Sequence, residues 1–160
     1  MDQRVPMTPR GFEALKAELA RLKSVDRPEN IKDIEEAIAH GDLSENAEYH
    51  AAKEKQAMIA GRMALLDDKI ARAQIIDNVG ETPDKVRFGA TVTLTDIETD
   101  EKVEYTILGE DEADAKQGRI SVTSPVARAL MNKEIGDEVS VKVPKGMREL
   151  EVLEVRFDEV

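Results

Sequence analysis

The fold is decided by a ten-residue stretch, His40-Gly41-Asp42-Leu43-Ser44-Glu45-Asn46-Ala47-Glu48-Tyr49, where two long segments with a heptad pattern meet. Heptad segments joined by a short bend are typical of neighbouring antiparallel helices. Within the stretch, acidic residues recur every three positions, at Asp42, Glu45 and Glu48. We therefore expect a helical hairpin that carries three carboxylates at its end.

The segment before the bend predicts a helix that begins at the N-cap Thr8 and continues to about His40. Its seam is expected from apolar residues at heptad spacing: Phe12, Leu15, Leu19, Leu22, Ile31, Ile34 and Ile38. Nine positions separate Leu22 from Ile31, which shifts the phase by two, and Pro28 lies between them. We therefore expect a kink or a local rewinding of the helix near Pro28.

The segment after the bend predicts a second helix that begins near Leu43 or Ser44. About 30 residues would make a rod of roughly 45 Å. Its expected seam is Tyr49, Ala52, Gln56, Ile59, Met63, Leu66, Ile70 and Ala73. Small side chains, including Ala57 and Ala60, are expected to let the partner helix approach closely.

A different pattern begins after the polar linker at residues 78–84. Alternation with a period of two predicts strands at residues 90–95, 103–108, 120–122, 139–143 and 150–157. Ser124 and Pro125 predict the start of a short helix that ends near Met131. We therefore expect an α+β domain at 85–160, following a hairpin at 1–77 whose acidic tip is 41–49.

The composition excludes several kinds of chemistry. The 160 residues include no cysteine and two histidines, which excludes disulfides, cysteine-ligated zinc and thiol catalysis, and argues against a histidine-rich metal site. No apolar run approaches the roughly 20 residues of a membrane span, and the first residues have no signal-peptide core. We expect a cytoplasmic protein with neither a membrane partner nor a small-molecule substrate.

The net charge of −11 is unevenly distributed. Residues 1–77 hold 12 Lys and Arg against 15 Asp and Glu, whereas residues 78–160 hold 11 against 19. A chain this acidic should not bind nucleic acid through bulk electrostatics. The N-terminal half is the part that tolerates a polyanion, and the C-terminal half favours a basic protein surface.

The acids at the bend suggest shared metal chemistry. If the second helix begins near Leu43, residues three apart point roughly the same way, and Asp42 and Glu45 could share a hard cation such as Mg²⁺. The site would bind weakly alone and better if a second protein supplied a carboxylate and a phosphate, as in two-metal phosphoryl transfer. Leu43, exposed at the bend, suggests a partner surface. The alternative is that these acids only complement the helix dipole.

The tip stretch, extended to Glu54, resembles the tip motif of the bacterial transcript cleavage factors, the Gre family. The resemblance continues through further segments, namely Pro6-Met7-Thr8-Pro9-Arg10-Gly11, Phe88-Gly89-Ala90-Thr91-Val92, Gly109-Glu110-Asp111-Glu112-Ala113-Asp114 and Ile120-Ser121-Val122-Thr123-Ser124-Pro125-Val126-Ala127-Arg128. These segments follow one another in family order and extend over nearly the whole chain.

The resemblance implies that the hairpin enters the secondary channel of RNA polymerase, while an FKBP-like C-terminal domain docks at the channel rim, with Ser124 and Pro125 near the contact. Asp42 and Glu45 match the acidic pair that helps hold a catalytic Mg²⁺ in the polymerase, which then cuts the 3′ end of backtracked RNA. The factor would stimulate this reaction and would not itself be the enzyme.

The resemblance also assigns supporting roles. Lys53 and Lys55 would contact the nascent RNA 3′ end, although Ile38 stands where a basic residue often occurs in the family. Both lysines could equally be flanking positions of a coiled coil. The tip would be supported by Leu43, Asn46, Glu48 and Tyr49, although Glu48 could pair within its helix and Tyr49 could simply pack in the seam.

Three other functions remain open from the sequence. A paralogue could block the polymerase channel as an inhibitor, although Asp42 and Glu45 argue against this. A coiled-coil adaptor or chaperone would need no tip chemistry. A proline isomerase would need an aromatic pocket, and residues 78–160 contain only Phe88, Tyr105 and Phe157 as aromatic residues.

Overall fold

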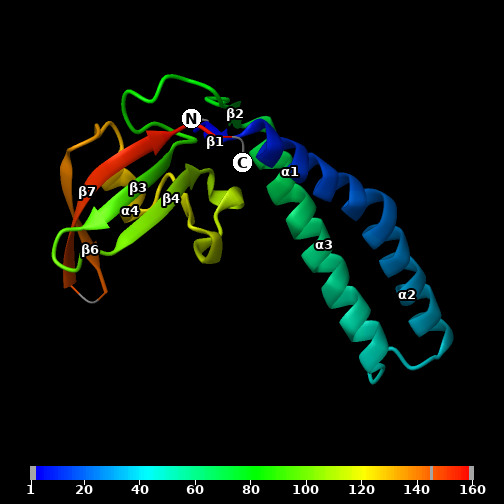
Figure 1. Ribbon diagram of the computed structural model, residues 1–160. Helices are drawn as coiled ribbons and strands as arrows, with labels where there is room; N and C mark the ends of the chain where they lie inside the picture. Colours follow the sequence, from blue (N-terminus) through cyan, green and yellow to red (C-terminus); the bar gives the residue numbers. More distant parts are fainter. Residues whose placement is uncertain (1–2, 145, 159–160) are drawn as a thin grey trace. The chain divides into compact units, whose positions relative to one another are not determined.

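The computed structural model describes residues 3–144 and 146–158, which divide into two compact units (Figure 1). Residues 12–73 form a helical hairpin, and residues 4–11 with 74–158 form a unit built around a five-stranded sheet. The predicted α+β fold class, a helical hairpin followed along the chain by a small α+β domain, is confirmed.

The first arm of the hairpin is a helical run whose hydrogen-bond pattern changes in the middle. It consists of α1 (Pro9–Arg21), the π-helical turn η1 (Leu22–Asp26) and α2 (Arg27–Ala39). The N–H of Arg27 donates to the carbonyl of Leu22, five residues earlier rather than four. Pro28 accounts for the change, because proline has no N–H and its ring crowds the preceding turn. The rewinding expected near Pro28 is confirmed.

The π-helical turn shifts the seam by one residue, not by the two that the sequence suggested. Leu22 is followed in the buried face by Asn30 and Ala37, so eight residues separate Leu22 from Asn30. Ile31 and Ile38, which were expected in the seam, are 45% and 50% exposed. That expectation was wrong, because one π-helical turn adds a single residue to the repeat.

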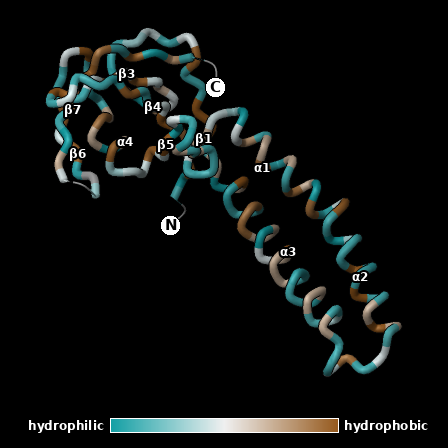
Figure 2. Tube along the Cα trace, turned by 60° about the horizontal axis from the view of Figure 1, so that its bottom comes forward, coloured by the Kyte–Doolittle hydropathy of each residue, from teal (hydrophilic) through white to brown (hydrophobic). Residues whose placement is uncertain are grey.

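The second arm is α3 (Ala47–Ala71), whose 25 residues span about 37 Å. Its buried seam residues recur every seven positions, at Ala52, Ile59 and Leu66. Figure 2 shows that hydrophobic and hydrophilic residues are interspersed along both arms. Ala57 is exposed, as is Ala60, so the expectation that they face the partner helix was wrong. The reason is helical geometry, since Ala57 lies roughly 140° around the helix from Ala52. No helix in the described part of the chain is long and apolar enough to cross a membrane.

An ion pair between α1 and α3 joins the two arms of the hairpin. The guanidinium of Arg62 on α3 donates to both carboxylate oxygens of Glu18 on α1, with an Nη2–Oε1 distance of 2.7 Å and an Nε–Oε2 distance of 2.5 Å. This bidentate hydrogen bonding to Arg62 lowers the pKa of Glu18 below its usual 4.5. The pair therefore links the arms most effectively when Glu18 is ionised.

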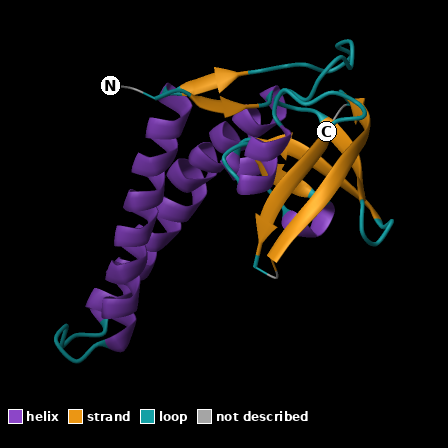
Figure 3. Cartoon of the chain, turned by 90° about the vertical axis from the view of Figure 1, so that its left-hand side faces the viewer, coloured by secondary structure: helices purple, strands orange, loops and turns teal. Residues whose placement is uncertain are grey.

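The second unit is built on a small sheet with short helical segments beside it (Figure 3). Its five strands are β3 (Thr91–Asp96), β4 (Lys102–Leu108), β5 (Arg119–Ser121), β6 (Glu138–Val143) and β7 (Gly146–Arg156). Their order is β5-β4-β3-β7-β6, and only β4 and β5 pair in parallel. β7 begins four residues before the predicted strand, because the register with β6 continues to the turn at Gly146.

The core of this unit lies between one face of the sheet and α4 (Pro125–Leu130). Leu94, Ile107 and Val152 come from three adjacent strands and are fully buried. Ala127 and Leu130 cover them from α4. The predicted alternation of apolar and polar residues along these strands therefore produces a one-sided core, as expected for an antiparallel sheet.

A junction within this unit joins its first residues to the short 3₁₀ helix η2 (Glu110–Glu112), which a second 3₁₀ helix, η3 (Ala115–Gln117), follows in the chain. The carboxylate of Glu112 accepts from the N–H of Gly109 at 3.1 Å and from the N–H of Thr8 at 3.2 Å, and it also accepts from the Thr8 hydroxyl. A Cβ on Gly11 would collide with the Glu112 side chain. Two of the segments that carry the family resemblance therefore meet in one cluster.

This junction shifts the boundary between the units from the expected residue 77. The strands β1 (Val5–Met7) and β2 (Ala73–Ile75) pair as a two-stranded sheet, and the Ile76 N–H donates to the Met7 carbonyl at 2.9 Å. Residues 4–11 and 74–77 consequently belong with the sheet unit.

Candidate functional site at the hairpin tip

The tip is the loop of residues 40–46 between the end of α2 and the start of α3. Gly41 has a φ of +83°, a left-handed conformation that favours glycine after a helix. Its N–H donates to the Ile38 carbonyl at 3.1 Å, which satisfies an acceptor at the end of α2. The expectation that the first helix continues to about His40 is confirmed, since α2 ends at Ala39.

Asn46 joins the two arms at the tip. Its Oδ1 accepts from the Tyr49 N–H at 3.0 Å and caps α3, while its Nδ2 donates to the Ala37 carbonyl on α2 at 2.8 Å. Because the cap is Asn46, α3 begins at Ala47, later than the expected Leu43 or Ser44. Asn46 thus links the end of α2 to the first turn of α3, and its role in the function of the tip stays a prediction.

Asp42 and Glu45 are exposed side chains on the loop, outside any helix. The helical spacing from which they were expected to share a face does not apply, because the chain is in a turn at residues 43–45. Asp42 Oδ1 accepts from the Ser44 hydroxyl at 2.9 Å, a bond that holds its carboxylate near the loop backbone. Leu43, between the two acids in sequence, is 40% exposed.

Glu48 is the one acid of the three in the first turn of α3, where it complements the helix dipole. Its Oε2 lies 3.4 Å from Nδ1 of His40 at the end of α2. The suggested pairing with a lysine on its own helix is therefore replaced by a contact across the loop. The contact reinforces the link that Asn46 makes between the arms.

The two histidines of the chain flank the tip, since His40 begins the loop and His50 lies four residues after its end, and neither was predicted as a site residue. His50 Nε2 is 3.1 Å from the Ser44 carbonyl, so the imidazole spans the loop turn. The rings of Tyr49 and His50 meet edge to face, with centroids 5.6 Å apart. Tyr49 is half-buried, as expected if it packs in the seam. The signal in the sequence was that the chain has only two histidines and that both lie close to the acidic stretch at the bend.

The tip supplies hard oxygen donors but no complete metal site. Asp42 and Glu45 offer carboxylates of the kind that Mg²⁺ prefers. Among residues 3–144 and 146–158, however, no group of three or more His, Asp or Glu side chains is placed to hold a metal. The residues fit a cation only if another molecule provides the remaining ligands.

The two candidate RNA-contact lysines lie in different surroundings. Lys53 lines a groove with Arg27 and Ile31, and its Nζ donates to Gln56 Oε1 at 2.8 Å. Lys55 lines a separate groove whose acidic residues are Asp33, Glu36 and Glu48. The structure does not bring the lysines into one basic patch, and the Lys55 groove is acidic enough to repel a phosphate backbone.

Ser124 and Pro125 begin α4, as predicted. Ser124 Oγ accepts from the Ala127 N–H at 3.3 Å, and Pro125 occupies the first turn, where its missing N–H has no acceptor to satisfy. Pro125 is exposed. The pair therefore has a structural role that is independent of any docking contact.

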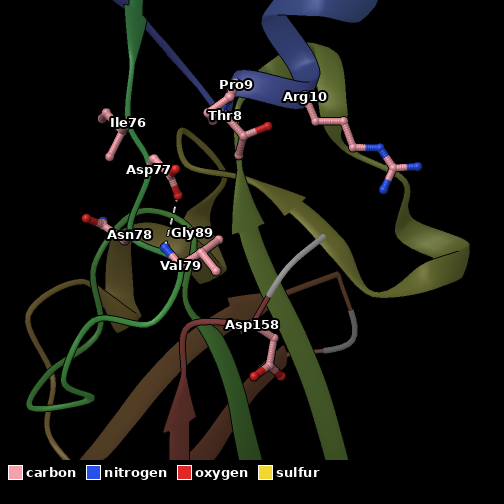
Figure 4. Close-up of a pocket in the computed structure, with 9 residues that line it drawn as sticks. All are labelled: Thr8, Pro9, Arg10, Ile76, Asp77, Asn78, Val79, Gly89 and Asp158. Carbon is pink, nitrogen blue, oxygen red and sulfur yellow. Dashed lines mark hydrogen bonds between the residues drawn. The ribbon is translucent and has the colours of Figure 1, made fainter.

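A pocket of about 360 Å³ lies in the sheet unit, between its first residues and the segment after β2 (Figure 4). Its lining residues are Thr8, Pro9, Arg10, Ile76, Asp77, Asn78, Val79, Gly89 and Asp158. Both carboxylates have partners within the chain: Asp77 accepts from the Val79 N–H at 3.2 Å, and Asp158 from Arg156 Nε at 2.9 Å. This pocket was not predicted, and its acids are engaged in local structure.

Two models of known protein families match this chain, and together they cover most of both units. Residues 5–75 match the N-terminal domain model of transcription elongation factors, and residues 81–157 match the GreA/GreB C-terminal domain model. A transcription elongation factor GreA from Hyphomonas neptunium is 61% identical over 155 residues, covering 97% of this chain and 99% of the relative. GreA from Anaeromyxobacter sp. (strain K) is 58% identical over 157 residues, covering 98% of this chain and 95% of the relative.

A further relative and a solved structure extend the comparison. GreA from Neisseria meningitidis is 56% identical over 156 residues, covering 97% of this chain and 99% of the relative. The crystal structure of GreA factor homolog 1 from Thermus thermophilus is 28% identical and has a TM-score of 0.44, covering 96% of this chain and 99% of that chain. On the family matches and the full-length sequence identities, this chain belongs to the Gre family of transcription elongation factors.

Proposed function

We propose that the hairpin enters the secondary channel of bacterial RNA polymerase and stimulates the polymerase to cleave backtracked RNA. The observation that carries this proposal is the placement of Asp42 and Glu45. Both acids are exposed on a loop at the end of a two-helix rod, and the second helix alone spans about 37 Å. A rod of this length can deliver two carboxylates into a narrow channel.

In this proposal the catalyst is the polymerase, and the present chain is a cofactor rather than an enzyme. Asp42 and Glu45 would bind a Mg²⁺ ion jointly with polymerase carboxylates and orient the attacking water. When bound, the ion would activate water for attack on the phosphodiester. The incomplete ligand set at the tip supports this sharing, since two carboxylates without further ligands bind Mg²⁺ weakly.

The remaining assignments follow from the same proposal. Lys53 is the better candidate for contact with the RNA 3′ end, because Arg27 shares its groove whereas Lys55 faces acidic residues. The sheet unit would dock at the channel rim near Ser124 and Pro125, where Pro125 is exposed. Because its proposed partner is the bacterial RNA polymerase, the protein would act in the cytoplasm.

A stalled polymerase complex with 3′-labelled RNA tests the proposal. The protein should release short 3′ fragments, and Asp42→Asn or Glu45→Gln should lower the cleavage rate by at least about a hundredfold, the typical effect of losing a group that stabilises the transition state. Glu54→Gln, an exposed acid on α3, is the matched control and should cleave normally. Polymerase binding should be unchanged in all three variants.

Three results would contradict the proposal. Loss of polymerase binding in the Asp42 and Glu45 variants would make the acids docking groups. A chain that slows RNA synthesis without releasing fragments would be a channel-blocking inhibitor. Full function after replacement of Asp42, Glu45 and Glu48 by amides would instead indicate an adaptor that needs no tip chemistry.

A further inference from the structure

The face of α2 that packs against α3 is less apolar than a face that α2 leaves in solvent. Asn30 and Ala37 are 1% and 2% exposed, whereas Ile31 and Ile38 are 45% and 50% exposed. Burial of apolar area alone would favour the opposite arrangement, because isoleucine removes more apolar surface from water than alanine or asparagine. An interaction other than hydrophobic burial must therefore act together with the π-helical turn to select the rotation of α2 about its axis.

Asn30 makes that interaction. Its Nδ2 donates to the Ala52 carbonyl on α3 at 2.9 Å, within the buried seam. Ile31 is one residue further along, so bringing it into the seam would rotate α2 by roughly 100° and remove Asn30 from Ala52. Buried asparagines at such seams favour one pairing of helices over others, at a cost in stability.

The rotation of α2 bears directly on the tip. Ala37 lies one heptad after Asn30, and its carbonyl accepts from Asn46 at 2.8 Å, so both bonds belong to the same face of α2. α2 ends at Ala39, only three residues before Asp42. Glu45, in contrast, is adjacent to the cap of α3. The rotation of α2 relative to α3 therefore determines where Asp42 lies relative to Glu45.

We propose that Asn30 is a positioning residue: by selecting the rotation of α2, it holds Asp42 in its working position relative to Glu45. The inference rests on the proposed function, because it assumes that the two acids act together on RNA cleavage. In the alternative arrangement Ile31 and Ile38 enter the seam, and the position of Asp42 relative to Glu45 changes.

The rotation can be measured directly. The chain has no cysteine, so Lys32→Cys and Met58→Cys, at exposed positions on α2 and α3, can carry a pair of spin labels. The labelled parent should give one distance population. Asn30→Ala should add a second population, because it removes the selecting hydrogen bond. Adding Ile31→Gln and Ile38→Gln to that variant should restore one population, because the side chains that favour the alternative seam are gone.

Cleavage of a stalled complex supplies the functional readout. Asn30→Ala should lower the maximal cleavage rate by roughly tenfold to a hundredfold, as small displacements of reacting groups do, without changing the half-saturating concentration. The variant that also carries Ile31→Gln and Ile38→Gln should recover cleavage. Ile34→Ala is the matched control, because it removes a half-buried side chain of α2 but leaves Asn30 in place. It should keep one distance population and normal cleavage.

A single distance population in Asn30→Ala would overturn the proposal, and so would a second population without loss of cleavage. Loss of cleavage that Ile31→Gln and Ile38→Gln fail to rescue would also overturn it, since Asn30 would then act only through general stability. If the parent itself does not stimulate cleavage, the proposed function fails. The distance measurement then still decides whether Asn30 selects the rotation of α2.

Discussion

The sheet core and the hairpin tip are built in opposite ways. In the core, Leu94, Ile107 and Val152 are fully buried, and their positions follow from packing. At the tip, the candidate acids Asp42 and Glu45 are exposed, and the loop is held by side-chain bonds from Asn46 and His50. It follows that the acidic side chains proposed to act in RNA cleavage can be replaced without disturbing the fold. The buried side chains that stabilise the fold, in contrast, take no part in the proposed reaction.

The largest effect on folding is expected in the core. Leu94→Ala should lower the free energy of unfolding by about 2–5 kcal/mol, because it removes buried methyl groups and leaves a cavity. Urea denaturation of the full chain measures the change, with Ile135→Ala as the control. Ile135 is 57% exposed, so its loss should have little effect. Equal effects of the two variants would contradict a core on one face of the sheet.

A smaller effect is expected where two backbone segments meet in the sheet unit. A Cβ on Gly109 would lie 2.5 Å from the Pro6 carbonyl oxygen, so Gly109→Ala should cost about 1–3 kcal/mol of stability. Gly61→Ala is the matched control on α3, where a Cβ meets nothing within 4 Å. That change should stabilise the hairpin by about 0.5–1 kcal/mol, because alanine favours the helix. The midpoint temperature of thermal unfolding should therefore fall for Gly109→Ala and rise for Gly61→Ala.

The ion pair between the hairpin arms predicts a modest pH dependence. Arg62 lowers the pKa of Glu18 in the folded chain below 4.5, so the unfolded chain binds a proton more readily. The stability from this pair is present above the unfolded pKa and is lost as the pH falls through the folded pKa. Both side chains are more than a third exposed, so the contribution should stay under about 1 kcal/mol.

Comparison of Glu18→Gln with the parent measures that contribution. The parent should lose more stability than Glu18→Gln as the pH falls below 4.5. High salt should reduce the difference, because screening weakens exposed ion pairs. Parallel pH curves for the two proteins would show that the pair contributes nothing to folding.

The smallest effect on folding is expected at the tip. Asp42→Asn and Glu45→Gln should change the free energy of unfolding by no more than about 0.5 kcal/mol, as is usual for exposed positions. The same variants are expected to abolish most RNA cleavage. A large loss of stability would show that the acids belong to the scaffold, and the contrast between tip and core would no longer hold.

Much of this molecule could be predicted from local patterns. The seam of α3 at Ala52, Ile59 and Leu66 follows from a heptad, and the strands of the sheet follow from alternation, since both reflect the periodicity of a single segment. The family resemblance, carried by the tip motif and four further segments, was confirmed by the family matches. The functional assignment of Asp42 and Glu45 stays a prediction.

By itself, the sequence determined the hairpin, the sheet unit and the presence of acidic residues at the bend, because these depend on neighbours a few residues apart. Only the tertiary structure decided the rotation of α2 and the junction at Glu112. The first depends on a π-helical turn and on a bond from Asn30 to Ala52, 22 residues away. The second joins Glu112 to Thr8 across 104 residues. The residue pattern of a single segment does not predict such contacts, because they form only when folding brings residues from distant segments together.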